Sequence, residues 1–321
     1  MMKSILLMVV IFLPFFATNG ICEQPVSIGV RSANDHVPFY IAQKLDLYRK
    51  EGISAVVKLF PSNTEIVEAM KRKEIQIGVF PISTAITAIS NGVPIKIIAM
   101  TGKGSDGILV RKEDPIKSFS DLKGKKIATI RASILDLLLM FALEKEGLDP
   151  NKDVELRYFM TLGDMVAALK IGQVDATSNT EPFMTEAEMS GWGKILTYYT
   201  KYWPDHPCCV ITGHREFLGL KPYLVKKVLK VHIDAVKYAN SDLDFTSKTI
   251  AEYIGSPDIK IIKQSLSPEK MKISYEIDSK EVVRIAELLK RYKMIERLPS
   301  VEEMLDLTYL KGALKDRVWR Q

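Results

Sequence analysis

Glu65–Gly78 reads EIVEAMKRKEIQIG, and Asp164–Thr177 reads DMVAALKIGQVDAT. The two segments start 99 positions apart (65 and 164) and align an acid with an acid, an apolar pair with an apolar pair, and Lys71 with Lys170. In each segment a short amphipathic helix is followed by a tight turn and a short apolar strand. This repeat indicates that the chain contains two similar halves.

The same spacing holds on the N-terminal side of both segments. Ser27–Val30 matches Lys126–Thr129, and each is a short apolar stretch that runs into a predicted helix. The helices are expected over about 37–50 and 134–145, and each stops before a glycine that accepts a left-handed conformation. Farther along, 93–99 resembles 192–197. Each half therefore has a β-α-β-α-β pattern, typical of a mostly parallel sheet covered by helices on both faces.

These patterns predict an α/β protein with two lobes of about 100 residues each and a helical C-terminal tail. The expected boundaries are 21–111 plus 208–321 for the first lobe and 112–207 for the second. The tail is expected to form helices near 222–239, 246–254, 279–292 and 301–307 and to pack back on the first lobe. Two unrelated α/β domains with chance similarity are the alternative.

The composition is that of a folded soluble protein. The 321 residues are 47% hydrophobic and 26% charged, with a net charge of +6 from 45 basic and 39 acidic residues. These values exclude a disordered chain and a disulfide-stapled miniprotein, and so small an excess of positive charge argues against a nucleic acid partner.

Residues 1–20 are predicted to be a secretory signal peptide that is not part of the fold. Lys3 supplies the positive start, and the apolar run from Ile5 to Phe16 is shorter than the roughly 20 residues that a membrane-spanning helix needs. An uncleaved N-terminal anchor is the alternative. Cys22 lies near the cleavage region, so a lipid anchor is a second possibility, but Ile21 precedes it where a lipoprotein site has a small residue. The prediction is an exported, periplasmic protein without an anchor.

Polar residues follow the predicted strands at the edge where ligands of open α/β sheets bind. Many of them are also expected to cap the next helix, as Ser62 does with Glu65 and Ser133 with Asp136. Several helix N-termini then face one cleft, which suits an anionic or hydrogen-bond-accepting ligand. The candidate ligand-binding residues from these loops are Asn34, Asp35, His36, Ser62, Ser83, Thr84, Arg131, Ser133 and Glu181.

Three of these candidates have alternative interpretations. Arg131 pairs with a carboxylate, sulfonate or phosphate, or it is a solvated surface residue. Asp35 and His36 contact a ligand or cap the first helix. Glu181 binds a ligand amine, or it bridges to a basic residue across the cleft.

Motifs of common enzymes are missing. The sequence has no phosphate loop, dinucleotide fingerprint, Gly-x-Ser-x-Gly elbow or His-Glu-x-x-His motif, and its four histidines are scattered. No catalytic residue, cofactor or metal site is therefore predicted. Cys208 and Cys209 are adjacent; they are expected to be two small residues of a buried strand, and a strained vicinal disulfide is the alternative.

Four stretches resemble one known family. These are Val37–Ile53, Ile66–Gly78, Asp121–Ile127 and the step Glu181-Pro182. They are similar to the periplasmic substrate-binding proteins of ABC transporters, in the branch that includes nitrate, sulfonate, taurine and thiamine-pyrimidine-precursor binders. The resemblance covers about residues 25–240.

The resemblance implies a two-lobed type II periplasmic-binding-protein fold that closes on a small, anionic or heteroaromatic ligand and docks on an ABC permease. It implies a monomer and adds Thr101 to the candidate contacts. The segment Arg131–Ile134 departs from the usual turn of small residues and favours a more anionic ligand.

Two rival functions remain at this stage. One is an enzyme of pyrimidine- or menaquinone-precursor metabolism on the same fold, and it would need a catalytic His or Cys in the cleft. The other is a sensor module that reports ligand occupancy to a membrane partner.

Overall fold

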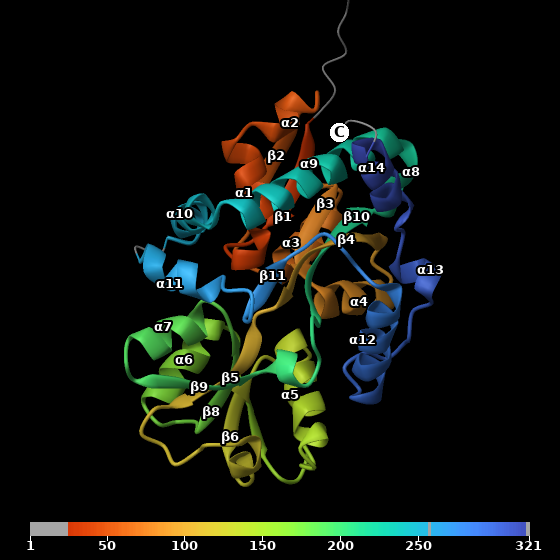
Figure 1. Cartoon of the computed structure of the whole chain (residues 1–321). Helices are drawn as coiled ribbons and strands as arrows, with labels where there is room; N and C mark the ends of the chain where they lie inside the picture. Colours follow the sequence, from red (N-terminus) through yellow and green to blue (C-terminus); the bar gives the residue numbers. More distant parts are fainter. Residues whose placement is uncertain (1–24, 256–257, 319–321) are drawn as a thin grey trace, which may run out of the picture.

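A computed structural model describes residues 25–255 and 258–318 of the chain. The expected signal peptide, residues 1–20, and Cys22 lie outside the described residues. Figure 1 shows an upper and a lower α/β lobe, each with its own sheet, joined through β4, β5 and β10. Within the described ranges, none of the helices has the length and apolar character needed to span a bilayer.

The first sheet has six strands in the order β11-β4-β10-β3-β1-β2. β1 pairs in parallel with β2 and β3, whereas β10 runs antiparallel to both β3 and β4. β11 adds a short antiparallel edge to β4. The strands are β1 (Val26–Val30), β2 (Ala55–Leu59), β3 (Ile77–Pro81), β4 (Ile95–Gly104), β10 (Pro207–His214) and β11 (Met271–Ile273).

The second sheet has five strands in the order β7-β6-β8-β5-β9. β6 pairs in parallel with β7 and β8, and β5 runs antiparallel to β8 and β9. The strands are β5 (Asp106–Arg111), β6 (Lys126–Thr129), β7 (Glu155–Tyr158), β8 (Ala176–Thr180) and β9 (Gly193–Tyr198).

Five strands of the first sheet, in the order β2-β1-β3-β10-β4, have the same arrangement as β7-β6-β8-β5-β9 of the second, which confirms the repeat that the sequence predicts. β1 faces β3 with Ile28 opposite Ile77, and β6 faces β8 with Ile127 opposite Ala176, so the partners are 49 positions apart in both lobes (28 to 77, 127 to 176). The matching helices are α3 (Asn63–Lys71) and α6 (Leu162–Lys170). Ser62 and Thr161 cap them by accepting a backbone N–H from the third residue on, which confirms the cap predicted at Ser62.

Each sheet contains one antiparallel strand that directly follows, in the chain, a strand of the other sheet. β5 follows β4 after the single residue Ser105, yet it pairs only within the second sheet, between β8 and β9. β10 crosses back after β9 and pairs between β3 and β4. The expected first-lobe segment 21–111 includes residues 106–111, whereas these form β5 of the second sheet. An apolar strand looks the same in either sheet, and only its pairing partners distinguish them.

Helices cover both faces of both sheets, and apolar side chains fill the interior. On α3, for example, Ile66, Ala69 and Met70 are buried against the sheet. The remaining helices of the two lobes are α1 (Val37–Lys44), α2 (Leu47–Lys50), α4 (Ile82–Ser90), α5 (Ile134–Lys145) and α7 (Phe183–Met189), with the 3-10 turns η1 (Asn34–His36), η2 (Phe119–Leu122) and η3 (Tyr199–Lys201).

The C-terminal tail packs on the first lobe, as expected, and also reaches the second. Helix α9 lies against α1, and α14 lies against α9. Lys270 donates to Thr185 of α7 at 2.8 Å, and Arg291 of α12 forms an ion pair with Glu144 of α5. The tail helices are α8 (Arg215–Leu220), α9 (Pro222–Ser241), α10 (Leu243–Ile254), α11 (Ile259–Ser265), α12 (Ser279–Arg291), α13 (Val301–Met304) and α14 (Thr308–Val318).

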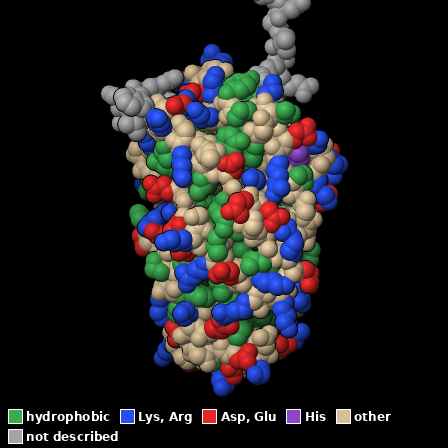
Figure 2. Space-filling view, turned by 90° about the vertical axis from the view of Figure 1, so that its right-hand side faces the viewer, with side chains coloured by type: hydrophobic (Ala, Val, Ile, Leu, Met, Phe, Trp, Pro, Cys, Tyr) green, Lys and Arg blue, Asp and Glu red, His purple; other side chains and the backbone are tan. Residues whose placement is uncertain are grey.

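Charged side chains of both signs are mixed on the surface. Figure 2 shows the side of the molecule that lies at the right of Figure 1, and there Lys and Arg alternate with Asp and Glu over the described part of the face. This distribution matches the small net charge of +6.

Gly78 tests how tightly α3 packs on the first sheet. A Cβ added at Gly78 would lie 2.4 Å from the Met70 sulfur and 2.8 Å from the Phe80 ring. Gly78→Ala is therefore expected to lower the free energy of unfolding by about 1–3 kcal/mol in urea denaturation.

Gly163→Ala is the matched control. This glycine lies in α6, and its added Cβ meets no described atom within 4 Å. The control is expected to leave stability unchanged or to raise it slightly. Equal stabilities of the two variants would contradict the close packing of α3.

Candidate functional site

The carboxyl ends of the parallel strands in the two sheets meet at the crossing. β4 ends at Gly104 and β5 begins at Asp106, which pairs with Thr180, the last residue of β8. Ser105 is held on both sides, because its N–H donates to the Lys270 carbonyl and its carbonyl accepts the Glu181 N–H. Ligands of open α/β sheets bind at this type of edge. The fold therefore brings candidate residues from both lobes to one place.

Asp35 and His36 lie on η1, directly after β1, and are positioned by β4. The Thr101 hydroxyl donates to the Asp35 carbonyl at 2.5 Å. Gly102 leaves room for the Asp35 side chain, because a Cβ at Gly102 would lie 2.4 Å from the Asp35 Cβ. Thr101 thus positions η1 through a hydrogen bond to its backbone.

The ring of His36 has a defined tautomer. Its Nδ1 accepts the backbone N–H of Arg31 at 2.9 Å, so the proton of the neutral ring must be on Nε2. Burial lowers the pKa of His36, which favours this neutral form. Nε2 is buried and has no hydrogen-bond acceptor among the described residues. It is 3.9 Å from Asp35 Oδ1, too far for a hydrogen bond.

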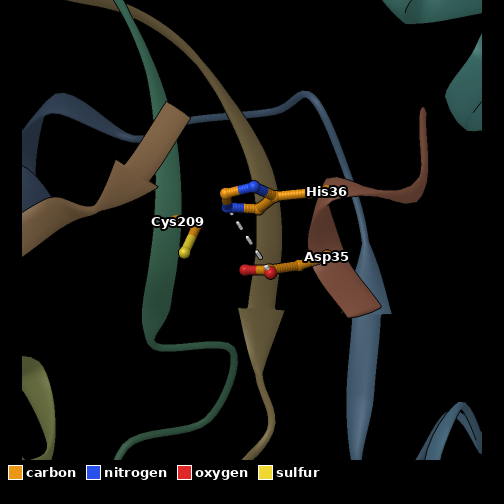
Figure 3. A group of neighbouring side chains, drawn as sticks. All are labelled: Asp35, His36 and Cys209. Atoms are coloured by element: carbon orange, nitrogen blue, oxygen red, sulfur yellow. Dashed lines mark ion pairs between the residues drawn. The ribbon is translucent and has the colours of Figure 1, made fainter. Parts of the chain in front are cut away.

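Figure 3 shows that Asp35, His36 and Cys209 point toward one another from η1 and β10. One ligand-type atom from each residue lies within 4.8 Å of the others. A metal would need a lone pair on Nε2, and metal-bound histidines usually donate from the other ring nitrogen. Because Nδ1 of His36 accepts a hydrogen bond, this arrangement does not suit a metal.

The same geometry argues against an activated cysteine. The neighbouring Cys208 thiol, burial and the Asp35 carboxylate together raise the pKa of the Cys209 thiol well above its ordinary value. His36 offers it an N–H and not a basic nitrogen. Cys208 and Cys209 are free, buried residues of β10, which confirms the buried-strand interpretation over a vicinal disulfide.

Other first-lobe candidates have mixed surroundings. Asn34 donates to the Ser265 hydroxyl at 2.9 Å, while its Oδ1 is buried without a donor in the described chain. Ser83 is fully buried in the first turn of α4, and its hydroxyl also lacks a partner there. Thr84 is half-buried beside it, and Ser62 accepts the Glu65 N–H as a helix cap.

In the second lobe, the loop after β6 places a buried acid next to an exposed base. Ser133 caps α5 by accepting the Asp136 N–H at 3.3 Å, which confirms the predicted cap. Asp136 Oδ2 accepts the Ala132 N–H, and burial raises the pKa of Asp136 to about 6. Arg131 is exposed and stacks on the Tyr158 ring at 3.8 Å, a surface position that matches the second interpretation of this residue.

Glu181 forms a buried network between the lobe and the tail. Its carboxylate accepts the Thr185 N–H at 3.1 Å, the Thr185 hydroxyl at 2.9 Å and the Tyr198 hydroxyl. Lys270 Nζ lies 3.8 Å from it. Burial raises the pKa of Glu181, and Tyr198 and Lys270 oppose this effect. Of the two interpretations of Glu181, the structure matches the bridge to a basic residue.

Sequence reasoning missed Lys270 and Asp106. Lys270 lies in the tail between α11 and β11, where no pattern distinguishes it from an exposed lysine. Asp106 Oδ2 lies 3.2 Å from the His206 ring. Asp106 lies at the first crossing between the sheets and His206 at the return crossing, so the two crossings are in contact. The alternation of the strand around Asp106 gives no sign of this contact.

The central polar residues are closed off from solvent. Asp35, His36 and Glu181 expose 6%, 1% and 4% of their surface. Two open hollows of about 180 and 190 Å³ lie elsewhere, one beside Lys270 at the crossing and one beside His214 in the first lobe. In this arrangement of the lobes, these three side chains have almost no solvent-accessible surface.

Comparison with known proteins identifies the family. The NMT1-like family matches residues 21–255, which is most of the chain. The chain belongs to the NMT1-like family. It is 27% identical over 241 residues to the taurine-binding periplasmic protein of Escherichia coli, covering 74% of this chain and 69% of that protein. It is 26% identical over 301 residues to a putative aliphatic sulfonates-binding protein of Bacillus subtilis, covering 91% and 88%.

Solved structures share the fold of this NMT1-like protein. The ligand binding component of an ABC-type import system from Staphylococcus aureus superimposes with a TM-score of 0.80 at 18% identity, covering 91% of this chain and 99% of that one. The predicted periplasmic-binding-protein fold is therefore confirmed.

A buried ion pair that joins the tail to the second lobe can be tested directly. Lys270→Met leaves the Glu181 carboxylate buried without its cation, and we expect it to lower the free energy of unfolding by about 3–5 kcal/mol. The double variant Lys270→Met/Glu181→Gln removes the unpaired charge and should regain much of that loss. Urea unfolding of the two variants measures both effects, and additive losses would contradict the pairing.

Asp136 predicts a pH dependence of stability. Its pKa is about 6 in the folded protein against an ordinary value of 3.8, so folding favours the protonated acid. This contribution is present below pH 4 and is lost as the pH rises through 6. Asp136→Asn should therefore gain about 3 kcal/mol relative to the wild type between pH 4 and pH 7. Parallel curves of unfolding free energy against pH for the two proteins would contradict the assignment.

Proposed function

We propose that this NMT1-like protein is an extracytoplasmic solute-binding protein that delivers a small molecule to an ABC permease. One observation carries the proposal. Buried polar atoms without partners in the described chain come from both lobes, where the carboxyl ends of the two sheets meet. In the first lobe they include Asn34 Oδ1, Asp35 Oδ2, His36 Nε2 and Ser83 Oγ, and in the second Thr129 Oγ1 and Asp136 Oδ1.

Unmatched buried groups are costly, about 1–3 kcal/mol each. A protein that keeps several of them near one edge gains stability when a polar ligand satisfies them. The ligand then favours the closed arrangement of the lobes over an open one by its difference in affinity for the two. The unmatched groups support capture followed by closure.

The relatives support the same role. The Escherichia coli and Bacillus subtilis proteins are named for binding taurine and aliphatic sulfonates, and the Staphylococcus aureus protein belongs to an ABC-type import system. Export, a monomeric state and a permease partner are part of this proposal for the present chain, as are the ligand contacts of Asn34, Asp35, His36, Ser83 and Thr84 in the first lobe.

An enzyme is the second candidate function, and a specific observation favours it. The desulfurization enzyme DSZB has the same fold, with a TM-score of 0.71 at 15% identity over 91% of this chain and 99% of that one. Cys209, His36 and Asp35 also form a compact group. The N–H of His36 and the raised pKa of the Cys209 thiol weigh against a nucleophile.

The proposal predicts that ligand stabilises and compacts the protein. At 100 times its Kd, a bound solute adds about 2.7 kcal/mol of stability. Thermal melting and small-angle scattering with taurine, ethanesulfonate and nitrate should show a higher Tm and a smaller radius of gyration for at least one probe. Native mass spectrometry of the gently purified protein should show a retained small molecule.

Cys209→Ala separates the two functions. A solute-binding protein is expected to keep its thermal response in this variant, while an enzyme that uses the thiol loses turnover. The absence of both a retained molecule and any thermal response would count against solute binding.

A further inference from the structure

The η1 turn presents a hydrogen-bond donor and an acceptor side by side, and neither has a partner among the described residues. The donor is the His36 Nε2–H, whose position follows from the Arg31 N–H that Nδ1 accepts. The acceptor is Asp35 Oδ2. The two side chains do not satisfy each other, since 3.9 Å separates Nε2 from Oδ1. Both residues are more than nine-tenths buried.

The immediate surroundings supply one further acceptor and two further donors. Asn34 Oδ1 is a buried acceptor, and the neutral Cys209 thiol, whose pKa is raised in part by a side-chain hydrogen bond to Asp35, is a weak donor to that carboxylate. The Arg31 guanidinium acts on the charge of His36, and its Nε–H is a buried donor with no partner in the described part of the chain. Among the described residues, no cationic side chain lies within ion-pair distance of Asp35, because the His36 ring at 3.9 Å is in its neutral form.

This arrangement is unfavourable for an oxyanion bound directly against η1. A sulfonate or nitrate oxygen placed next to Asp35 would bring a second negative charge to a buried carboxylate, which costs more as water is excluded. A ligand nitrogen that carries hydrogen has the opposite effect, because it donates to Asp35 Oδ2 and relieves an unmatched acceptor. A neighbouring acceptor atom of the same ligand is then within reach of the His36 Nε2–H.

We propose that the first lobe binds its solute through a nitrogen-bearing donor group, such as an amine, amidine or amide, which donates to Asp35 while an adjacent acceptor atom takes the His36 Nε2–H. The inference rests on the solute-binding function proposed above. It assigns the ligand class that this lobe selects, and it excludes simple oxyanions from η1. Any anionic group of the ligand lies away from Asp35, toward Arg31 or the second lobe.

The test compares probes that carry a nitrogen donor group with partners that lack one; the first two pairs differ only by the amine, and the third also differs in charge. Isothermal titration of the whole mature protein uses taurine against ethanesulfonate, β-alanine against propionate, and benzamidine against benzoate, with nitrate as a simple oxyanion. The nitrogen-bearing member of at least one pair is expected to bind about 10–100-fold more tightly than its partner, the range for a hydrogen bond to a charged group. This comparison needs no variant.

Asp35→Asn gives a response whose sign separates the alternatives. If a nitrogen donor occupies η1, the variant loses about 10-fold or more in affinity for that probe. If an oxyanion occupies η1, the variant binds it more tightly, because a repulsive charge is gone and an N–H is gained. Asp164→Asn, an exposed acid at the start of α6, is the matched control and should change neither affinity. Melting temperatures verify that both variants fold.

The outcomes distinguish the two proposals. If amine-free oxyanions bind as tightly as their partners, or gain affinity in Asp35→Asn, solute binding stands and the assignment of η1 is overturned. If no probe binds and the purified protein retains no molecule, the proposed function fails, and this inference fails with it. Loss of the nitrogen preference in Asp35→Asn alone supports the assignment.

Discussion

The crossing of the chain between the sheets is the constraint on which the rest of the structure depends. A single residue, Ser105, separates β4 of the first sheet from β5 of the second, and it has a left-handed φ of +79°. The return crossing brings His206 to within 3.2 Å of Asp106. The chain passes from one sheet to the other at this point, before β5 and again before β10. The carboxyl edges of both sheets must therefore face the same space. The polar groups of the site follow from that placement.

Burial then turns those polar groups into a binding site. Where the chain satisfies them internally, as Thr185 and Tyr198 satisfy Glu181, they hold the lobes and tail together. Where it leaves them unmatched, as at Asp35 and His36, their cost is offset only by a ligand or by water. Buried polar side chains therefore stabilise the fold around Glu181, and around Asp35 and His36 they are available for ligand recognition.

Particular residues show how far prediction from sequence reached. The repeat gave the two sheets, their helices and the caps at Ser62 and Ser133, because helical and strand periodicity are local properties. The sequence did not show that 106–111 pairs in the second sheet, and it did not distinguish the buried Asp35 from the exposed Arg131, since both follow a strand in a polar loop. Partners distant in sequence, such as Lys270 for Glu181, left no local pattern to read.

The sequence by itself determined that the chain forms two equivalent α/β halves with polar loops at their strand ends, because the spacing of apolar residues specifies strands, helices and the sheet face that each helix covers. Only the tertiary structure decided which strand belongs to which sheet, which loop residues are buried, and which nitrogen of His36 carries the proton. These depend on contacts between segments far apart in the sequence, such as Asn34 and Ser265, which are 231 positions apart. No local pattern of residue types encodes contacts of that range.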